Sequence, residues 1–251
     1  TEYATTKLTD LAINWVETQT KPWFLWMAYN APHTPFHLAP TNLHSQGNLA
    51  TNESSINSNP LPYYLSALEA LDTEMGRFLS SLSAEERANT IIIFIGDNGT
   101  PNKVAQSPYG RTTAKGSLYQ GGINVPMVVS GLGVSRMSVR ESALINSTDL
   151  YATIGNIAGV STSEINNSSS FYNLFTVANT TKREYVYSEK EDAYTIRNAT
   201  FKFIKFNDGT EKLYNLSNDA YEVSNLIDNT LSEEAAAART LLISEADRIR
   251  N

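Results

Sequence analysis

Hydrophobic residues in the first part of the chain change from helical spacing to an unbroken run. Apolar side chains recur every three or four positions from residue 8 to residue 16, which predicts an amphipathic helix that ends at Lys21-Pro22. Residues 23–29 then form a continuous apolar run of strand length. Because a run without alternation is typical of a strand covered on both faces, it predicts a strand of a parallel sheet between helices.

The middle of the chain repeats this change of pattern. A polar stretch at 42–60 predicts a surface excursion, and residues 63–82 have the periodicity of a long amphipathic helix. The apolar run at 90–95 predicts a buried strand, which ends in Gly96-Asp97-Asn98-Gly99. After a long polar loop, residues 124–129 predict a further buried strand. Strands that alternate with helices indicate an α/β layered fold with a mainly parallel central sheet flanked by helices.

Beyond a predicted helix at 148–159 the strands become short and rich in Tyr, Phe and Ile. Four of them are expected, at 185–189, 193–198, 201–206 and 212–216, with a turn at Asn207-Asp208-Gly209 between the last two. A helix from about 232 to 250 follows. The pattern therefore predicts an α/β domain over 1–180 and, over 181–251, a small antiparallel sheet with a C-terminal helix.

Composition excludes several classes of protein. With 41% hydrophobic and 18% charged residues, the 251-residue chain resembles ordinary globular proteins and not disordered ones. The net charge of -7 and the lack of a basic stripe argue against a nucleic-acid partner. The longest apolar runs are too short to span a bilayer, and the absence of cysteine excludes disulfides and thiolate metal sites.

Asp97 and Asn98 are the first candidate site residues, because they follow the strongest predicted strand. Ligands of open α/β sheets bind beyond the carboxyl ends of the strands, and carboxylate and amide oxygens suit Ca²⁺ or Mg²⁺. Asn98-Gly99 could instead be a simple hairpin turn. A hairpin requires an alternating strand directly afterwards, and residues 100–113 are polar and irregular.

His33 and Lys115 are further candidates, each with two interpretations. His33 lies between Pro32 and Thr34-Pro35 after an expected strand, where it could bind an anion or donate a proton, or be an ordinary surface histidine. Lys115 precedes Gly116 in a segment that ends in Gly121-Gly122. Glycines let backbone approach an anion closely, but for the motif taken alone a flexible loop with a solvated lysine is the favoured interpretation.

Several motifs in the same order resemble the C-terminal half of type I sulfatases, which are arylsulfatase-like enzymes of the alkaline phosphatase superfamily. The resemblance covers nearly the whole chain, since similar segments also occur at 148–154 and 211–216. The motifs that carry it are Lys21-Pro22-Trp23-Phe24-Leu25, Tyr29-Asn30-Ala31-Pro32-His33-Thr34-Pro35, Ile93-Phe94-Ile95-Gly96-Asp97-Asn98-Gly99, Lys115-Gly116-Ser117-Leu118-Tyr119-Gln120-Gly121-Gly122 and Val125-Pro126.

This resemblance implies hydrolysis of sulfate monoesters with one divalent cation, Ca²⁺ or alternatively Mg²⁺. It implies that Asp97 and Asn98 are metal ligands and that His33 and Lys115 contact the sulfate as catalytic and substrate-binding residues. Cationic groups of this kind would stabilise the negative charge that spreads over the sulfate during cleavage. The family also suggests a sulfated small molecule or carbohydrate as substrate and a periplasmic or secreted location.

The chain departs from the family pattern at its most important residue. Sulfatases carry a formylglycine made from Cys or Ser in a Cys/Ser-x-Pro-x-Arg motif, which is absent here together with the first pair of metal aspartates. We therefore expect the formylglycine in a missing N-terminal half and expect this chain alone to be inactive. Gln120 replaces the usual acidic residue and Asn124 an arginine, which puts contacts to the substrate in doubt.

Two alternative functions remain open. A phosphodiesterase or phosphonate hydrolase of the same superfamily would often have Asp-His-Gly where this chain has Asp97-Asn98-Gly99. A carboxamide is a poor zinc ligand, so Asn98 favours a single hard cation and sulfate. A non-catalytic module of the same fold would explain the missing nucleophile, but half of the fold would expose a sheet edge.

Overall fold

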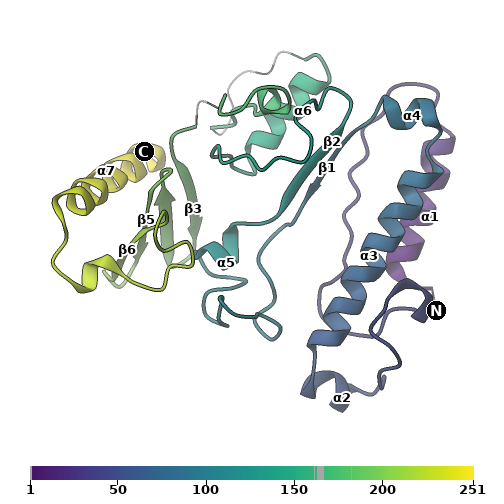
Figure 1. Ribbon diagram of the computed structural model, residues 1–251, viewed down its shortest axis with the longest axis horizontal. Helices are drawn as coiled ribbons and strands as arrows, with labels where there is room; N and C mark the ends of the chain where they lie inside the picture. The colour runs from purple at the N-terminus through teal and green to yellow at the C-terminus, as the bar shows by residue number, and fades with distance from the viewer. Residues whose placement is uncertain (1, 161, 163–166, 182) are drawn as a thin grey trace. The chain divides into compact units, whose positions relative to one another are not determined.

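The computed structural model describes residues 2–160, 162, 167–181 and 183–251. The chain divides into two compact units (Figure 1). The first comprises Thr1–Thr90 with Pro101–Ala105, and the second comprises Ile91–Thr100 with Gln106–Asn251. The sequence predicts a domain boundary between residues 180 and 181, and this boundary stays a prediction. None of the helices in the described ranges combines the length and apolar character that a membrane span requires.

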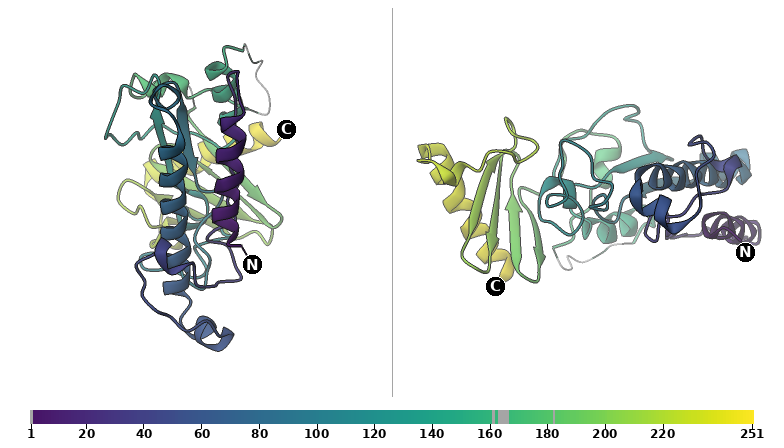
Figure 2. Two further views of the ribbon diagram at one scale, coloured as in Figure 1. Left: turned by 90° about the vertical axis from the view of Figure 1, so that its right-hand side faces the viewer. Right: turned by 90° about the horizontal axis from the view of Figure 1, so that it is seen from below.

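Two long helices dominate the first unit, as the apolar periodicity predicts. Helix α1 covers Ala4–Glu17 and helix α3 covers Leu61–Ser81, and the two lie side by side in Figures 1 and 2. The Oγ1 of Thr6 in α1 donates to the carboxylate of Glu74 in α3 at 2.7 Å. The remaining elements of this unit are short: η1 (Thr41–Leu43), α2 (Glu53–Ser58) and α4 (Ala84–Ala88).

The strand predicted at residues 23–29 is not present, which corrects the sequence prediction. The described segment carries no strand pairing, although its side chains alternate between half-buried and exposed positions as in an extended chain. Phe24 is 64% and Trp26 80% exposed. A strand requires a partner for its backbone groups, and the described residues of this unit provide none here.

The second unit begins with an antiparallel pair of strands, not with the parallel sheet that was predicted. Strand β1 (Ile91–Ile95) pairs with β2 (Met127–Gly131), with Ile91 opposite Gly131 and Ile95 opposite Met127. The Gly96 amide donates to the Pro126 carbonyl at 2.9 Å and continues this ladder. Because the strands are antiparallel, the segment that connects them starts and ends at the same end of the pair.

Helix α6 (Asp149–Ile157) and the short helix η2 (Tyr172–Phe175) pack beside this pair. Phe171, Leu174 and Phe175 form the buried centre of the cluster, and Ile91, Met127 and Val129 of the two strands pack against it. The side chains of β1 are half-buried rather than buried. The predicted helix at 148–159 is thus confirmed within two residues at each end.

The last part of the chain forms the predicted antiparallel sheet and helix. The strand order is β3 (Val186–Lys190), β4 (Ala193–Arg197), β5 (Phe201–Phe206) and β6 (Glu211–Asn215), all antiparallel. The 3-10 turn η3 (Leu226–Asp228) leads to helix α7 (Glu233–Arg250), which covers one face of the sheet (Figure 2). Leu242 and Ala246 of α7 pack against Ile196, Phe203 and Leu213 in a fully buried core.

Candidate functional site

Asp97 and Asn98 lie in a turn directly beyond the end of β1, as the sequence predicts. Asp97 is exposed and Asn98 is half-buried. The chain does not return as a hairpin, because the next strand begins only at Met127. Two hard oxygen donors are therefore presented at one end of the β1–β2 pair.

The segment that carries Lys115 is bonded to this turn by its backbone. The Lys115 amide donates to the Thr100 carbonyl at 3.0 Å, and the Gly99 amide donates to the Gly122 carbonyl at 2.9 Å. Both ends of the segment 115–122, here called the Lys115 loop, are thus fixed to the strand end that carries Asp97. The structure brings together two of the predicted groups although they are separated along the chain.

Glycines make this close approach possible. A Cβ on Gly99 would lie 2.1 Å from the Gly121 carbonyl oxygen, and one on Gly121 would lie 2.4 Å from that of Thr113. A Cβ on Gly122 would meet the Ser117 carbonyl oxygen at 2.2 Å. Such separations are impossible for a side chain, so the backbones pack together only because these residues are glycines. Gly99 serves the packing of the turn against the Lys115 loop, and Gly121 and Gly122 serve the packing within the segment 113–122, whatever they contribute to anion binding.

Glu222 is a residue at this site that sequence reasoning missed. Helix α5 (Gln120–Ile123) forms the end of the Lys115 loop, and its first amide, on Gln120, donates to Oε2 of Glu222 at 2.5 Å. Glu222 lies 102 positions further along the chain, in the segment after β6. A single glutamate in a polar loop carries no sequence signal that would have identified this contact.

His33 belongs to the first compact unit, so its position relative to Asp97 and Lys115 stays a prediction. Its side chain is exposed, and its Nδ1 lies 2.8 Å from the Thr34 carbonyl. The flanking bonds Ala31-Pro32 and Thr34-Pro35 are both cis. His33 lines a hollow of about 250 Å³, together with Tyr3, His37 and Tyr63 among others.

The other two histidines have local partners. Nδ1 of His37 lies 3.0 Å from the Pro35 carbonyl, and the His37 ring meets Tyr3 edge-on. His44 uses both nitrogens, since Nε2 lies 3.1 Å from the Ala39 carbonyl and Nδ1 accepts from the Gln46 amide. These local contacts are typical of ordinary loop residues.

A cation is compatible with the chemistry of Asp97 and Asn98, but these two residues would be only part of its site. No group of three or more His, Cys, Asp or Glu side chains that could hold a metal occurs among the residues described. Ca²⁺ takes about six to eight oxygen ligands, and Mg²⁺ about six. A carboxylate and a carboxamide therefore fit a hard divalent cation whose other ligands lie outside this turn.

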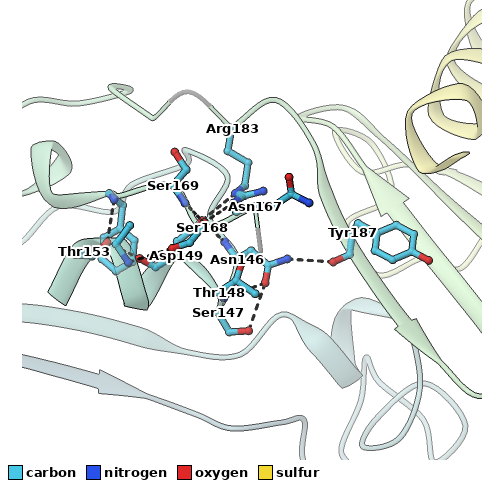
Figure 3. A network of polar contacts seen from close by, with 12 residues as sticks. Asn146, Ser147, Thr148, Asp149, Thr153, Asn167, Ser168, Ser169, Arg183 and Tyr187 are labelled. Carbon is cyan, nitrogen blue, oxygen red and sulfur yellow. Dashed lines mark hydrogen bonds and ion pairs between the residues drawn. The ribbon is translucent and has the colours of Figure 1, made fainter. Parts of the chain in front are cut away.

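Asp149 is a buried carboxylate of a different kind (Figure 3). It is 1% exposed, and its oxygens accept from the amides of Asn146 and Ser169 at 2.7 and 2.8 Å. Arg183 adds a bidentate ion pair, with Nε at 2.8 Å from Oδ2. Because its oxygens are already occupied, Asp149 serves to fix the start of α6 and leaves little capacity for a ligand.

Comparison with known proteins defines the family. The sulfatase family model matches residues 1–160, and the model of the N-sulphoglucosamine sulphohydrolase C-terminal region matches residues 112–246. The chain belongs to the sulfatase family and corresponds to its C-terminal region.

Two curated relatives illustrate the extent of the match. An uncharacterized sulfatase, YdeN of Escherichia coli (strain K12), is 31% identical over 63% of this chain and 28% of its own length. A sulfatase of Formosa agariphila is 24% identical over 93% of this chain and 47% of its own length. The chain thus spans less than half the length of these relatives.

Solved structures also match nearly all of this chain and only part of their own. The structure of Ps i-CgsB in complex with k-i-k-neocarrahexaose is 26% identical, covers 99% of this chain and 55% of that one, and has a TM-score of 0.79. BT4656 in complex with its substrate D-glucosamine-2-N,6-O-disulfate is 18% identical, covers 99% and 70%, and has a TM-score of 0.78. A phosphonate monoester hydrolase of Agrobacterium radiobacter shares the fold at 17% identity, with coverage of 98% and 60% and a TM-score of 0.71.

Proposed function

We propose that this chain is the C-terminal part of a sulfatase that hydrolyses sulfate monoesters. Membership of the family supports the reaction class. The observation that carries the assignment of residues is the backbone bonding of the Lys115 loop to the turn that holds Asp97 and Asn98. This bonding supports the proposal, because a cationic side chain and two oxygen donors on neighbouring loops could act together on the developing negative charge.

In this proposal Asp97 and Asn98 hold a single divalent cation, with Ca²⁺ preferred over Mg²⁺. When bound, the cation supplies positive charge beside the reacting sulfate. Lys115 binds the sulfate and stabilises the charge that develops on the leaving oxygen, and His33 orients the sulfate group. The nucleophile, a formylglycine, and the remaining metal ligands belong to an N-terminal part of the protein that lies outside this chain.

For the substrate we propose a sulfated carbohydrate or a smaller sulfate monoester. The support comes from the relatives: Ps i-CgsB binds the carbohydrate k-i-k-neocarrahexaose, and the substrate of BT4656 is a disulfated glucosamine. A periplasmic or secreted location is part of this proposal, and the acidic composition is compatible with it.

Phosphonate hydrolysis is the second candidate, because a phosphonate monoester hydrolase shares the fold. Asn98 argues against it, since zinc in two-metal sites favours imidazole over a carboxamide oxygen at this position. Turnover of an aryl sulfate compared with an aryl phosphate ester by the complete protein separates the two. A strong preference for the phosphate ester would replace our proposal, and loss of both activities would favour a non-catalytic module.

The substitution Asp97→Ala in the complete protein tests the metal site. We expect turnover to fall about 100-fold or more, because the cation loses a charged ligand and the sulfate loses its stabilisation. Calcium titration by calorimetry should show weaker binding in the same variant. Asp192→Ala is a suitable control, since this exposed aspartate lies in the turn after β3 and pairs there with Lys190 at the end of the strand. Equal activity of the two variants would refute the role of Asp97.

A further inference from the structure

A fully buried ion pair lies beside the Lys115 loop. Lys202 of β5 and Glu222 are both 0% exposed in their side chains, and Nζ lies 2.6 Å from Oε1. Burial of two charges is expensive, and apolar residues of similar size are often equally stable or better. Burial lowers the pKa of Lys202 to about 8 even though Glu222 lies beside it. The pair is thus poorly explained by fold stability alone.

Glu222 also has an unusual backbone conformation. Its φ is +59°, in the left-handed region that residues other than glycine rarely occupy. The following amides of Val223 and Ser224 both donate to Asp219 at 2.9 Å, which holds this turn. Strained conformations persist where the surroundings impose them, and they concentrate at functional sites. The conformation directs the Glu222 carboxylate to a defined place.

The Glu222 carboxylate lies at the first amide of α5. While Oε1 of Glu222 contacts Lys202, Oε2 accepts from the Gln120 amide at 2.5 Å. Gln120 directly precedes Gly121-Gly122, and the Gly122 carbonyl accepts from the Gly99 amide. A continuous path of contacts therefore leads from the buried pair to the turn that carries Asp97.

We propose that Glu222, held in place by Lys202, is a positioning residue for the Lys115 loop. Through the Gln120 amide it fixes the end of this loop against the turn at 97–100, and so sets where Lys115 lies relative to Asp97 and Asn98. The expected effect on turnover rests on the proposed function, whereas the expected effect on the position of the loop does not. A misplacement of about 1 Å can reduce turnover about 100-fold.

Two double variants of the complete protein test this role. Both remove the two buried charges, but K202M/E222Q retains an oxygen acceptor for the Gln120 amide and K202M/E222L does not. Hydrogen exchange of the segments 96–100 and 115–122, followed by mass spectrometry, reports the fixing of the loop. The kcat and KM for an aryl sulfate report the consequence for turnover.

We expect K202M/E222L to exchange faster in both segments than K202M/E222Q. Its kcat should be about 10- to 100-fold lower, with KM changed much less, because the loop loses position and not the whole binding site. The double variant K205M/E211L is the matched control, since Lys205 and Glu211 also pair between β5 and β6. It should leave exchange of the segments 96–100 and 115–122 unchanged.

If K202M/E222L does not fold, the hydrogen bond from the Gln120 amide to Glu222 can be removed by changing the donor instead of the acceptor. Q120P eliminates the amide hydrogen at the first position of α5, where proline is tolerated, and Tyr119 already has the extended conformation that proline prefers before it. Q120A retains the amide. The proposal requires faster exchange and lower kcat in Q120P than in Q120A.

Equal exchange and equal kcat within each pair of variants would overturn the positioning role. If the unchanged protein has no turnover of sulfate esters at all, the proposed function fails. In that case the exchange comparison alone decides whether Glu222 fixes the loop.

Discussion

At the scale of single residues, Gly99 has the tightest packing at the candidate site. A methyl group there would overlap the Gly121 carbonyl oxygen at 2.1 Å and the Gly122 Cα at 2.8 Å, both of them backbone atoms that cannot rotate away. We therefore expect Gly99→Ala to separate the turn at 97–100 from the Lys115 loop. Overpacking of this kind should destabilise the protein by about 1–3 kcal/mol.

Thermal unfolding and sulfatase turnover of Gly99→Ala measure this effect together. Gly76→Ala is the control, because a Cβ at Gly76 has no neighbour within 4 Å and the residue lies inside α3. This control should stabilise the protein by about 0.5–1 kcal/mol, since alanine favours a helix over glycine. A midpoint for Gly99→Ala as high as that of the unchanged protein would show that the two loops are not held by this contact.

The residues of the site differ in how far sequence reasoning could identify them. The position of Asp97 and Asn98 beyond a strand end was predictable, since it depends only on the end of a strongly apolar strand, and their role as ligands stays a prediction. Lys115 required the resemblance to a family, because one lysine among glycines also fits a flexible loop. Glu222 was not predictable, since its role depends on a left-handed backbone conformation and on a contact across 102 positions.

At the scale of elements, Glu211 joins helix α7 to the four-stranded sheet. It accepts from Lys205 of β5 at 2.5 Å and from Nε of Arg239 of α7 at 2.9 Å. Burial raises the pKa of Glu211, but the hydrogen bonds from Lys205 and Arg239 outweigh it, so the pKa lies below the ordinary value of 4.5. The ionised carboxylate is therefore favoured in the folded state.

This shift predicts how stability depends on pH. A depressed carboxyl pKa contributes stability above the unfolded value of 4.5, and the contribution is lost as the pH falls through the lower folded value. We expect Glu211→Gln to reduce the free energy of unfolding at pH 7 by about 1 kcal/mol, since the pair is partly exposed. The variant should also lose part of the fall in stability between pH 5 and 3.

Denaturant titrations at several pH values follow this change. Glu245→Gln on the same helix is the control, because its partner Arg248 is largely exposed and such a pair contributes little. Parallel pH profiles for Glu211→Gln and the unchanged protein would contradict the assignment.

The elements differ in how well the apolar pattern predicts them. The prediction was close for helices α1, α3, α6 and α7 and for strands β3 to β6, because these elements depend on local periodicity and on neighbours within this chain. The pattern cannot show which strands pair, so the antiparallel pairing of β1 and β2 was missed. The run at 23–29 has the composition of a strand, but none of the described residues pairs with it.

At the scale of the whole molecule, the first unit carries an apolar groove whose side chains are exposed. It has a volume of about 450 Å³ and is lined by α1 and by the extended segment 25–29. Trp26 lies on it at 80% exposure, and Leu11 and Trp15 of α1 are also exposed. Exposed apolar side chains that lie together, as these do, are typical of an interaction site. If an N-terminal part of the protein accompanies this chain, as proposed above, we infer that it covers the groove.

This inference predicts different effects of a serine substitution at two equally exposed positions. If the rest of the protein buries Trp26, Trp26→Ser should destabilise the complete protein by about 3 kcal/mol or more. Met137 is 78% exposed in the second unit, and Met137→Ser should stay within about 0.5 kcal/mol if it faces solvent in the complete protein. Chemical denaturation of both variants, with acrylamide quenching of tryptophan fluorescence, compares them. Stabilities that agree within error would mean that Trp26 remains in solvent and that nothing covers this part of the groove.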